Sequence, residues 1–299
     1  MKNTLVVIVG PTGVGKTELC LQIAEHLDIP IINADSRQIY KELPIGTAAP
    51  TIEQQQRVKH YFVGTRHIED YYNASMFEQD VLNTLKEHFL SKPVALLTGG
   101  SMMYIDAVCN GIDDIPTITP EIRAEMKGRL DKEGLPILLA DLKSLDPEYY
   151  AIVDKNNTRR VVHALEICHM TGKTYTSFRT RNVKPRPFKV LKIGLERPRE
   201  ELYRRINERV LHMMELGLER EALALYPQRG LTSLNAVGYR ELFDYFDQAI
   251  SKEEAVRRIQ SNTRRYMRKQ LTWFKKDKQI KWFYPSNIEE IIKYIDEAI

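Results

Sequence analysis

A glycine-rich segment near the start of the chain could bind phosphate. It reads GPTGVGKT over residues 10–17, which fits the pattern GxxxxGK[ST] at every fixed position. Glycines let successive backbone N–H groups converge on an anion, and the start of the following helix adds its positive dipole end. Lys16 would supply charge to the terminal phosphate oxygens, and the Thr17 hydroxyl is placed to coordinate Mg²⁺. We therefore expect a di- or triphosphate to be bound by Gly10, Pro11, Thr12, Gly13, Val14, Gly15, Lys16 and Thr17.

The phosphate-binding pattern alone does not identify a reaction, because nucleotide kinases, GTPases and helicases all carry one. Two further polar side chains narrow the choice. Asp35 follows an apolar, strand-like run at residues 29–33, and Ser101 follows another at residues 93–98. The carboxyl ends of parallel strands meet at the ligand-binding edge of such sheets. Asp35 could act there as a general base or a metal partner, or it could cap a turn.

The elements that would position these residues alternate between strand and helix. A fully apolar, β-branched run at residues 4–9 is typical of a buried parallel strand, and residues 16–27 have one apolar helical face. A capping box from Ser75 to Glu78 predicts the start of a helix that runs to about residue 90. The alternation predicts an α/β fold with a P-loop NTPase-like parallel sheet flanked by helices.

The pattern becomes helical in the middle of the chain, where no convincing strand interrupts it. The helical periods lie at residues 121–133, 136–145 and 158–171. A strand-like run at residues 189–195 then resumes the earlier pattern. We therefore expect a catalytic core made of residues 1–111 and 188–299, with an all-helical domain inserted at residues 112–187.

The C-terminal third is mostly helical. Pro198 suits the first turn of one helix, and Gly217 suits its end. Capping boxes that begin at Ser251 and Ser286 predict the starts of two later helices, the first of them long and basic. Residues 281–284 suit a last edge strand.

Composition is that of an ordinary globular protein. The 299 residues are 43% hydrophobic and 28% charged, and no apolar run approaches the length that crosses a bilayer. The start of the chain shows no signal-peptide cleavage site, so we expect a cytoplasmic protein, and a monomer. Cys20, Cys109 and Cys168 are widely separated among apolar neighbours, which favours buried thiols over disulfides or zinc ligands.

The net charge is only +4, but basic residues cluster in two stretches. Seven basic residues and no acidic one lie at positions 173–192, and nine basic residues with one acidic residue lie at positions 257–278. Such runs are often just solvated surfaces. Because both are interleaved with aromatic residues, they favour a polyanionic partner.

Together these segments resemble the tRNA dimethylallyltransferases (tRNA isopentenyltransferases) over nearly the whole chain. The resemblance rests on GPTGVGKT, NADSRQIYKELPIGTA, LLTGGSMMYIDA, RRVVHALEICHMTGK, LYRRINERVLHMMELGLEREA, AVGYREL and TRRYMRKQLTWFK, in this order. It implies transfer of a dimethylallyl group from dimethylallyl diphosphate to the exocyclic amine of the tRNA adenosine just 3′ of the anticodon. The phosphate loop would then hold the pyrophosphate of the donor, with Mg²⁺ as cofactor.

The resemblance also implies roles for individual residues. Asp35 occupies the position of the base that accepts the amine proton, and Ser101 stands where many members have threonine. Lys16 would stabilise the departing diphosphate. The helical insertion would grip the anticodon stem-loop. The tRNA-binding positions carried over are Asp35, Ser36, Arg37, Gln38, Ser101, Arg123, Arg159, Arg160, Val161, Val162, His163, Arg268, Lys269 and Gln270.

Two of these positions depart from the family pattern. Many members read Gln-Arg-x-x-Arg where this chain has residues 159–163, so Arg159 replaces a glutamine and His163 replaces an arginine. Base-level contacts by these two residues are therefore not implied. Further along, Trp273 and Phe274 could stack on bases or pack their helix onto the core.

Three other functions are weighed against this interpretation. An adenylate isopentenyltransferase would modify free nucleotides and would need neither the basic stretches nor the insertion. An ATP-dependent small-molecule kinase would need an acceptor-binding motif, and none is evident. A non-catalytic RNA-binding protein would have no use for an intact Lys16, Thr17 and Asp35.

Overall fold

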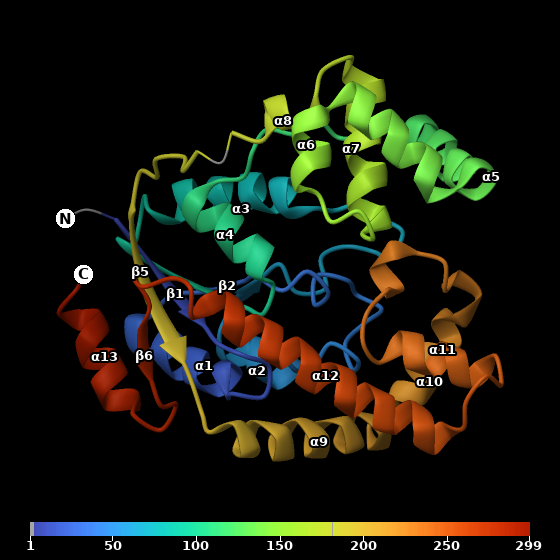
Figure 1. Cartoon of the computed structure of the whole chain (residues 1–299). Coiled ribbons are helices and arrows are strands. Elements are labelled where there is room, and N and C mark those ends of the chain that lie inside the picture. Colours follow the sequence, from blue (N-terminus) through green and yellow to red (C-terminus); the bar gives the residue numbers. More distant parts are fainter. Residues whose placement is uncertain (1–2, 181) are drawn as a thin grey trace. The chain divides into compact units, whose positions relative to one another are not determined.

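The structure is a computed structural model that describes residues 3–180 and 182–299. The chain divides into two compact units, each visible in Figure 1. The core unit comprises Met1–Asn110 and Pro185–Ile299, and the insert unit comprises Gly111–Lys184. Sequence patterning places the insertion at residues 112–187.

The core unit is built on a parallel sheet. Among the described residues the sheet has six strands in the order β3-β2-β4-β1-β5-β6, and every neighbouring pair is parallel. The strands are β1 (Thr4–Val9), β2 (Ile31–Asn33), β3 (His60–Tyr61), β4 (Val94–Thr98), β5 (Lys189–Leu195) and β6 (Lys281–Phe283). The expected α/β fold with a helix-flanked parallel sheet is confirmed, although the second strand begins at Ile31 rather than at residue 29.

Helices cover both faces of this sheet (Figure 1). They are α1 (Lys16–Leu27), α2 (Ile52–Arg57), α3 (Ala74–His88), α4 (Met102–Asn110), α9 (Arg199–Glu215), α10 (Leu218–Leu225), α11 (Tyr239–Phe246), α12 (Lys252–Phe274) and α13 (Ile288–Asp296). Short 3₁₀ turns lie at Tyr226–Gln228 and Thr232–Leu234. No helix in the described parts of the chain has both the length and the apolar character needed to cross a membrane.

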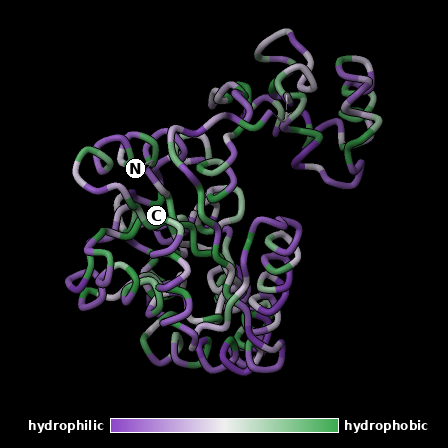
Figure 2. Tube along the Cα trace, turned by 90° about the vertical axis from the view of Figure 1, so that its left-hand side faces the viewer, coloured by the Kyte–Doolittle hydropathy of each residue, from purple (hydrophilic) through white to green (hydrophobic). Residues whose placement is uncertain are grey.

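Strand β1 divides the hydrophobic interior into two clusters, because successive strand residues face opposite sides of a sheet. Leu5, Val7 and Val9 pack with apolar residues of α3 and α4, whereas Val6 and Ile8 pack with those of α1. All five side chains are buried. Figure 2 shows hydrophobic residues gathered inside the core unit and hydrophilic residues along its outer helices. The buried sheet therefore provides a rigid base for the loops at its carboxyl edge.

The insert unit consists of helices in its described residues. Its elements are α5 (Pro120–Leu145), α6 (Pro147–Ile152), α7 (Thr158–Thr171) and α8 (Tyr175–Phe178). Helix α5 is interrupted at Gly134, which has a φ of 78°, so it behaves as the two helical stretches expected from the sequence. Met126, Leu138 and Val161 belong to a small hydrophobic cluster of this unit's own.

Two of the expected helix starts are wrong. Helix α3 begins at Ala74, and the Asn73 side chain accepts the capping hydrogen bond from Met76 N at 2.9 Å. Glu78 does not serve a capping box with Ser75, because its carboxylate is buried. Helix α13 is preceded by Asn287 rather than Ser286.

Of three other predicted helix ends, two are confirmed and one is shifted by a residue. Ser251 accepts a capping hydrogen bond from Glu254 N at 3.2 Å, as expected. Gly217 follows the C-cap of α9 with a left-handed φ of 101°, which confirms it as the helix stop. Pro198 is the N-cap of α9 instead of a first-turn residue. Cys20, Cys109 and Cys168 are free, buried thiols, and burial raises the pKa of Cys20 to about 11.

A buried ion pair fixes the point at which the chain returns to the core unit. Arg186 donates from Nη2 to Glu78 Oε1 at 2.6 Å and from Nε to the Val108 carbonyl at 2.8 Å. Both side chains of the pair are less than 10% exposed. The pair ties α3 and α4 to the segment that leads into β5.

Glu78→Ala should destabilise the protein by about 3–5 kcal/mol, because it leaves the Arg186 charge buried without its carboxylate. Urea denaturation of the purified variant measures this loss. Glu87→Ala on the exposed face of the same helix is the matched control and should change stability by less than about 0.5 kcal/mol. Equal stability of the two variants would contradict a structural role for the pair.

Candidate active site

The phosphate-binding pattern forms a loop between β1 and α1, as the sequence predicts. Gly13 and Gly15 have left-handed φ values of 84° and 107°, which favour glycine. A Cβ atom at Gly13 would lie 3.1 Å from the Ile206 side chain of α9, so the loop also packs closely against that helix. Helix α1 starts at Lys16, so its N-terminal N–H groups face the loop.

Lys16 folds back over its own loop. Its ammonium Nζ donates to the carbonyls of Gly10 at 2.8 Å and Pro11 at 3.0 Å. Burial, together with the positive charge of Arg209, lowers the pKa of Lys16 to about 8. Because burial disfavours the charged form of this lysine, a bound anion would stabilise it strongly. Thr17 is exposed at the start of the helix.

Three arginines hold consecutive residues of the loop. Arg209 Nη2 donates to the Thr12 hydroxyl, Arg205 Nε donates to the Gly13 carbonyl at 2.8 Å, and Arg197 Nε donates to the Val14 carbonyl at 2.8 Å. Sequence reasoning missed all three. The spacing of four between Arg205 and Arg209 was the available signal, since it places both on one face of α9.

Arg209 also carries an unused donor. Its Nε is buried and has no hydrogen-bond partner among the described residues. Burial lowers the pKa of this guanidinium, with the charge of Arg205 acting in the same direction and that of Asp35 opposing it. Buried polar atoms without partners are rare and costly. The buried Nε of Arg209 is therefore a donor that an anion at the phosphate loop could use.

Asp35 lies in the loop after β2. Its Oδ1 accepts hydrogen bonds from Arg37 N at 2.9 Å and Gln38 N at 3.3 Å, so it caps the turn. A Cβ atom on Gly100 would lie 3.3 Å from the other oxygen, Oδ2. The two roles weighed from the sequence are therefore compatible, because one oxygen caps the turn and the other faces Gly100.

Ser101 connects the loops that follow β2 and β4. Its Oγ accepts from Ser36 N at 2.8 Å and donates to Ser36 Oγ at 3.0 Å, while its backbone N donates to the Ala34 carbonyl at 3.1 Å. The strand ends approach so closely that a Cβ on Gly99 would lie 2.2 Å from the Ala34 oxygen. Ser36, the neighbour of Asp35, is thus brought together with Ser101 at the edge of the sheet where Asp35 and Ser101 were expected.

Gln38 is held by a loop that the sequence did not assign. Its Nε2 donates to the carbonyls of Thr47 and Ala48, both at 3.0 Å. The preceding turn is fixed by Glu221 of α10, which accepts from Ile45 N and Gly46 N at 2.9 Å each. Glu221 also accepts from the hydroxyl of Tyr239, whose pKa is raised by burial and by this carboxylate.

Helix α12 presents different residues to different neighbours. Arg268 and Lys269 are exposed, and Arg268 Nη1 donates to the Tyr203 hydroxyl at 2.8 Å. Gln270 is only 1% exposed, so its side chain has no surface to offer to RNA, contrary to expectation. Phe274 packs in the core, whereas Trp273 is 38% exposed and donates to Asp106 Oδ2 at 3.1 Å.

The remaining expected RNA-binding residues belong to the insert unit. Arg123 is exposed on α5, and Arg159 and Arg160 are exposed in the first turn of α7. Val161 is fully buried, so its side chain cannot contact RNA, because it fills the hydrophobic cluster of this unit. Val162 is half-buried. His163 is also half-buried, with Nδ1 3.5 Å from Glu166 Oε2 and its ring against Tyr175.

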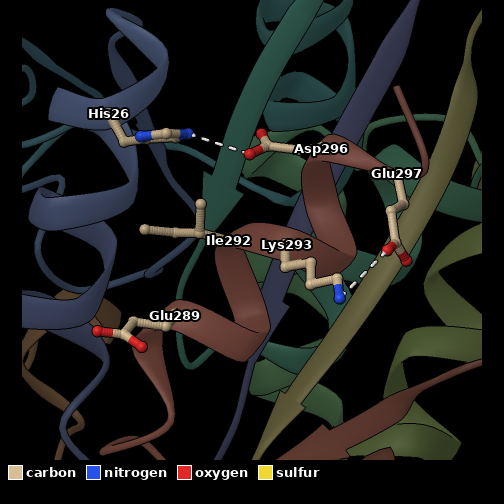
Figure 3. A pocket seen from close by; sticks show the side chains of 6 residues that line it. All are labelled: His26, Glu289, Ile292, Lys293, Asp296 and Glu297. Carbon is tan, nitrogen blue, oxygen red and sulfur yellow. Dashed lines mark hydrogen bonds and ion pairs between the residues drawn. The ribbon is translucent and has the colours of Figure 1, made fainter.

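Two hollows lie elsewhere in the core unit. One, of about 550 Å³, lies beside α13, where His26 pairs with Asp296 at 3.3 Å (Figure 3). Its other lining residues are Glu289, Ile292, Lys293 and Glu297, all from α13 or the residue that follows it. The other, of about 520 Å³, is lined by α11 and α12 and is rich in arginine. Its cationic residues are Arg229, Arg240, Arg258 and Arg265.

Histidine, cysteine and carboxylate side chains do not cluster as metal ligands in the described part of the chain. Within residues 3–180 and 182–299, no three such side chains form a group that could hold an ion. The phosphate-loop pattern would have a divalent ion held by the Thr17 hydroxyl together with oxygens of the bound phosphates. Hard oxygen donors of this kind suit Mg²⁺.

Comparison with known proteins agrees with this geometry. The chain matches the model of the IPP transferase family over residues 38–277. It is 59% identical to tRNA dimethylallyltransferase 1 of Phocaeicola vulgatus, covering 99% of this chain and 98% of that protein.

Solved structures similar to this chain are also transferases of this kind. The tRNA isopentenylpyrophosphate transferase of Bacillus halodurans has a TM-score of 0.72 at 34% identity, covering 99% of this chain and 96% of that one. A eukaryotic dimethylallyltransferase solved acting on tRNA has a TM-score of 0.74 at 25% identity, covering 91% of this chain and 69% of that one. With its phosphate loop, its Asp35 and Ser101 edge and the matched length, the chain belongs to the IPP transferase family.

Proposed function

We propose that this protein transfers a dimethylallyl group from dimethylallyl diphosphate to the exocyclic amine of the tRNA adenosine just 3′ of the anticodon, releasing diphosphate. One observation carries the proposal: a cationic phosphate loop lies at the same sheet edge as a carboxylate and a hydroxyl held by interlocking strand ends. In this reaction the diphosphate leaves as an anion and the adenine amine must lose a proton. The reaction therefore needs a cationic loop and a proton-accepting carboxylate side by side.

The donor side follows from charge. Negative charge builds on the diphosphate as the allylic carbon–oxygen bond breaks, and preorganised cations stabilise it. Lys16 and the N–H groups at the start of α1 would stabilise this anion, and the unpartnered Nε of Arg209 is a further donor for it. Mg²⁺, held by Thr17 and the phosphate oxygens, would neutralise charge on the leaving group.

The acceptor side depends on proton removal. The adenine amine is a weak nucleophile because its lone pair is delocalised into the ring, and Asp35 accepts its proton as the new carbon–nitrogen bond forms. The target base must leave its stack to reach this point. Ser36, Arg37 and Gln38 follow Asp35 in a loop that α10 braces through Glu221, which suits a fixed reading surface for that base.

Binding of tRNA would use both units. The exposed Arg123, Arg159 and Arg160 of the insert unit suit the phosphates of an anticodon stem-loop. In the core unit, exposed Arg268 and Lys269 and the arginine-rich hollow between α11 and α12 provide positive charge. We infer a monomeric enzyme, since one chain carries both halves of the site.

The alternatives receive less support. An adenylate isopentenyltransferase would use the same donor loop, but the relatives that match along almost the whole chain are named for tRNA. A kinase would transfer the γ-phosphate of ATP and would not need RNA.

The direct test incubates the protein with labelled dimethylallyl diphosphate, Mg²⁺ and unmodified tRNA, followed by digestion and identification of the nucleoside. Label in N6-dimethylallyl adenosine supports the proposal. Label in free AMP, or transfer of phosphate from ATP, would favour one of the alternatives.

Asp35→Asn should lower transfer by about 10²–10⁴-fold, because the amide cannot accept the proton. The asparagine oxygen can still cap Arg37 N and Gln38 N, so tRNA affinity should stay within a few-fold. Single-turnover rates and filter binding measure the two quantities. A large loss of tRNA affinity with intact chemistry would contradict the role of Asp35.

Diphosphate affinity should fall as the pH rises through about 8, because the buried Lys16 loses its charge above that pKa. At pH 9, one unit above that pKa, only about a tenth of the lysine is still protonated, so the affinity for diphosphate should be roughly tenfold lower. Lys16→Arg stays charged over this range, so its affinity should follow only the titration of the ligand. Calorimetry with Mg-diphosphate at pH 7 and pH 9 compares the two proteins, and parallel pH profiles would contradict the prediction.

Arg268→Ala should weaken tRNA binding several-fold and reduce the slope of log affinity against log salt by roughly 0.7–0.9, the value for one phosphate contact. Affinities between low and moderate salt concentrations give the slope. Lys293→Ala is the control, because Lys293 is exposed on α13, and it should leave the salt slope unchanged. An unaltered slope for Arg268→Ala would remove this residue from the RNA surface.

A further inference from the structure

Gln270 of α12 contacts two loops at the same time: the phosphate loop at Thr12, and the loop after β4 at Gly100, called the acceptor loop below. Its Oε1 accepts from Thr12 N at 2.8 Å, and its Nε2 donates to the Gly100 carbonyl at 2.8 Å. Thr12 belongs to the phosphate loop, and Gly100 immediately precedes Ser101. Both polar atoms of a buried amide are therefore used to join the loops that follow the paired strands β1 and β4, beyond the last pair of the ladder, Ile8 and Thr98.

The two ends of this bridge are not equally supported. The Gly100 carbonyl also accepts from the hydroxyl of Tyr266 at 3.0 Å, so it keeps a donor if Gln270 is lost. For the Thr12 amide, Gln270 is the acceptor, while Arg209 holds the hydroxyl of the same residue. Loss of Gln270 should therefore disturb the phosphate loop more than the acceptor loop.

The fit around the amide is tight. A Cβ atom on Gly100 would lie 2.9 Å from Gln270 Nε2 and 3.3 Å from Asp35 Oδ2. Gly100 thus lies between the glutamine and the carboxylate without a side chain to separate them. A shift of the glutamine would alter the space directly in front of Asp35.

We propose that Gln270 is a positioning residue that sets the distance between the diphosphate cradle and the carboxylate and hydroxyl of the acceptor side. The inference rests on the proposed function and deepens it. Gln270 touches neither substrate, since its side chain is buried and its amide is occupied by protein groups. Correct spacing of bound reactants accounts for much of an enzyme's rate, and small displacements are costly.

The test uses two substitutions and one control in the full chain. Gln270→Met keeps the size but removes both hydrogen bonds, and Gln270→Glu keeps an acceptor for Thr12 N while losing the donor to Gly100. Gln260→Met is the control, because Gln260 lies on the same helix and its Nε2 bonds to the Asn207 carbonyl at 3.3 Å. Calorimetry with Mg-diphosphate, filter binding of tRNA, steady-state kinetics and thermal melting are measured for each.

For Gln270→Met we expect diphosphate affinity to fall about tenfold and kcat about 10–100-fold, with tRNA affinity within twofold of the original. Gln270→Glu should recover most of the diphosphate affinity but little of kcat. Gln260→Met should leave both near the original values. This split between binding and turnover would support positioning, because a merely structural defect lowers the melting temperature and the active fraction without changing affinities selectively.

Three results would overturn the proposal. Unchanged diphosphate affinity and kcat in Gln270→Met would remove the bridge from the reaction. Selective loss of tRNA affinity would return Gln270 to the RNA surface. Equal losses in Gln270→Glu and Gln270→Met, with a lowered melting temperature, would indicate a packing role. Diphosphate binding needs no turnover, so a failure of the bridge is distinguishable from a failure of the proposed reaction, in which the unaltered protein itself transfers no label.

Discussion

The ends of β2 and β4 approach each other more closely than side chains would allow. Ala34 N donates to the Thr98 carbonyl at 2.7 Å, Ser101 N donates back to the Ala34 carbonyl at 3.1 Å, and Gly99 leaves room for this contact. Because parallel strands end at the same edge, this contact places Asp35 and Ser101 together beside the phosphate loop. The acceptor side of the site is therefore a consequence of backbone packing, and side-chain hydrogen bonds refine it.

Positive charge is concentrated around the phosphate loop without an equal negative charge from the protein. Lys16, Arg197, Arg205 and Arg209 contact carbonyl or hydroxyl oxygens of five consecutive loop residues, 10–14. Asp35 is the carboxylate that favours the charged forms of Lys16 and Arg209. Keeping cations partly desolvated is unfavourable unless an anion accompanies them. In the proposed reaction a bound diphosphate would offset that cost, and the same cations would stabilise it further as its negative charge grows.

Helix α12 explains how one element can serve several parts of the reaction. Its residues differ in role with their position around the helix: Arg268 and Lys269 are exposed, Tyr266 and Gln270 contact Gly100, and Phe274 packs in the core. The helix begins at Lys252, directly after its N-cap Ser251, and remains unbroken for 23 residues, which keeps these groups in fixed register. A basic helix of this kind can bind a polyanion on one side while bracing the chemistry on the other.

Local patterns determined much of this protein from the sequence alone. The phosphate loop, the buried strands, the helical insertion and the positions of Asp35 and Ser101 follow from spacing, capping and apolar periodicity, which act over a few residues. Tertiary structure decided what depends on distant partners. Glu78 fits a capping box locally but is drawn inward by Arg186, and Gln270 lies in a basic segment yet reaches Thr12, 258 positions away. No local pattern encodes such pairs, because a buried polar side chain takes the partner that folding brings within hydrogen-bond distance.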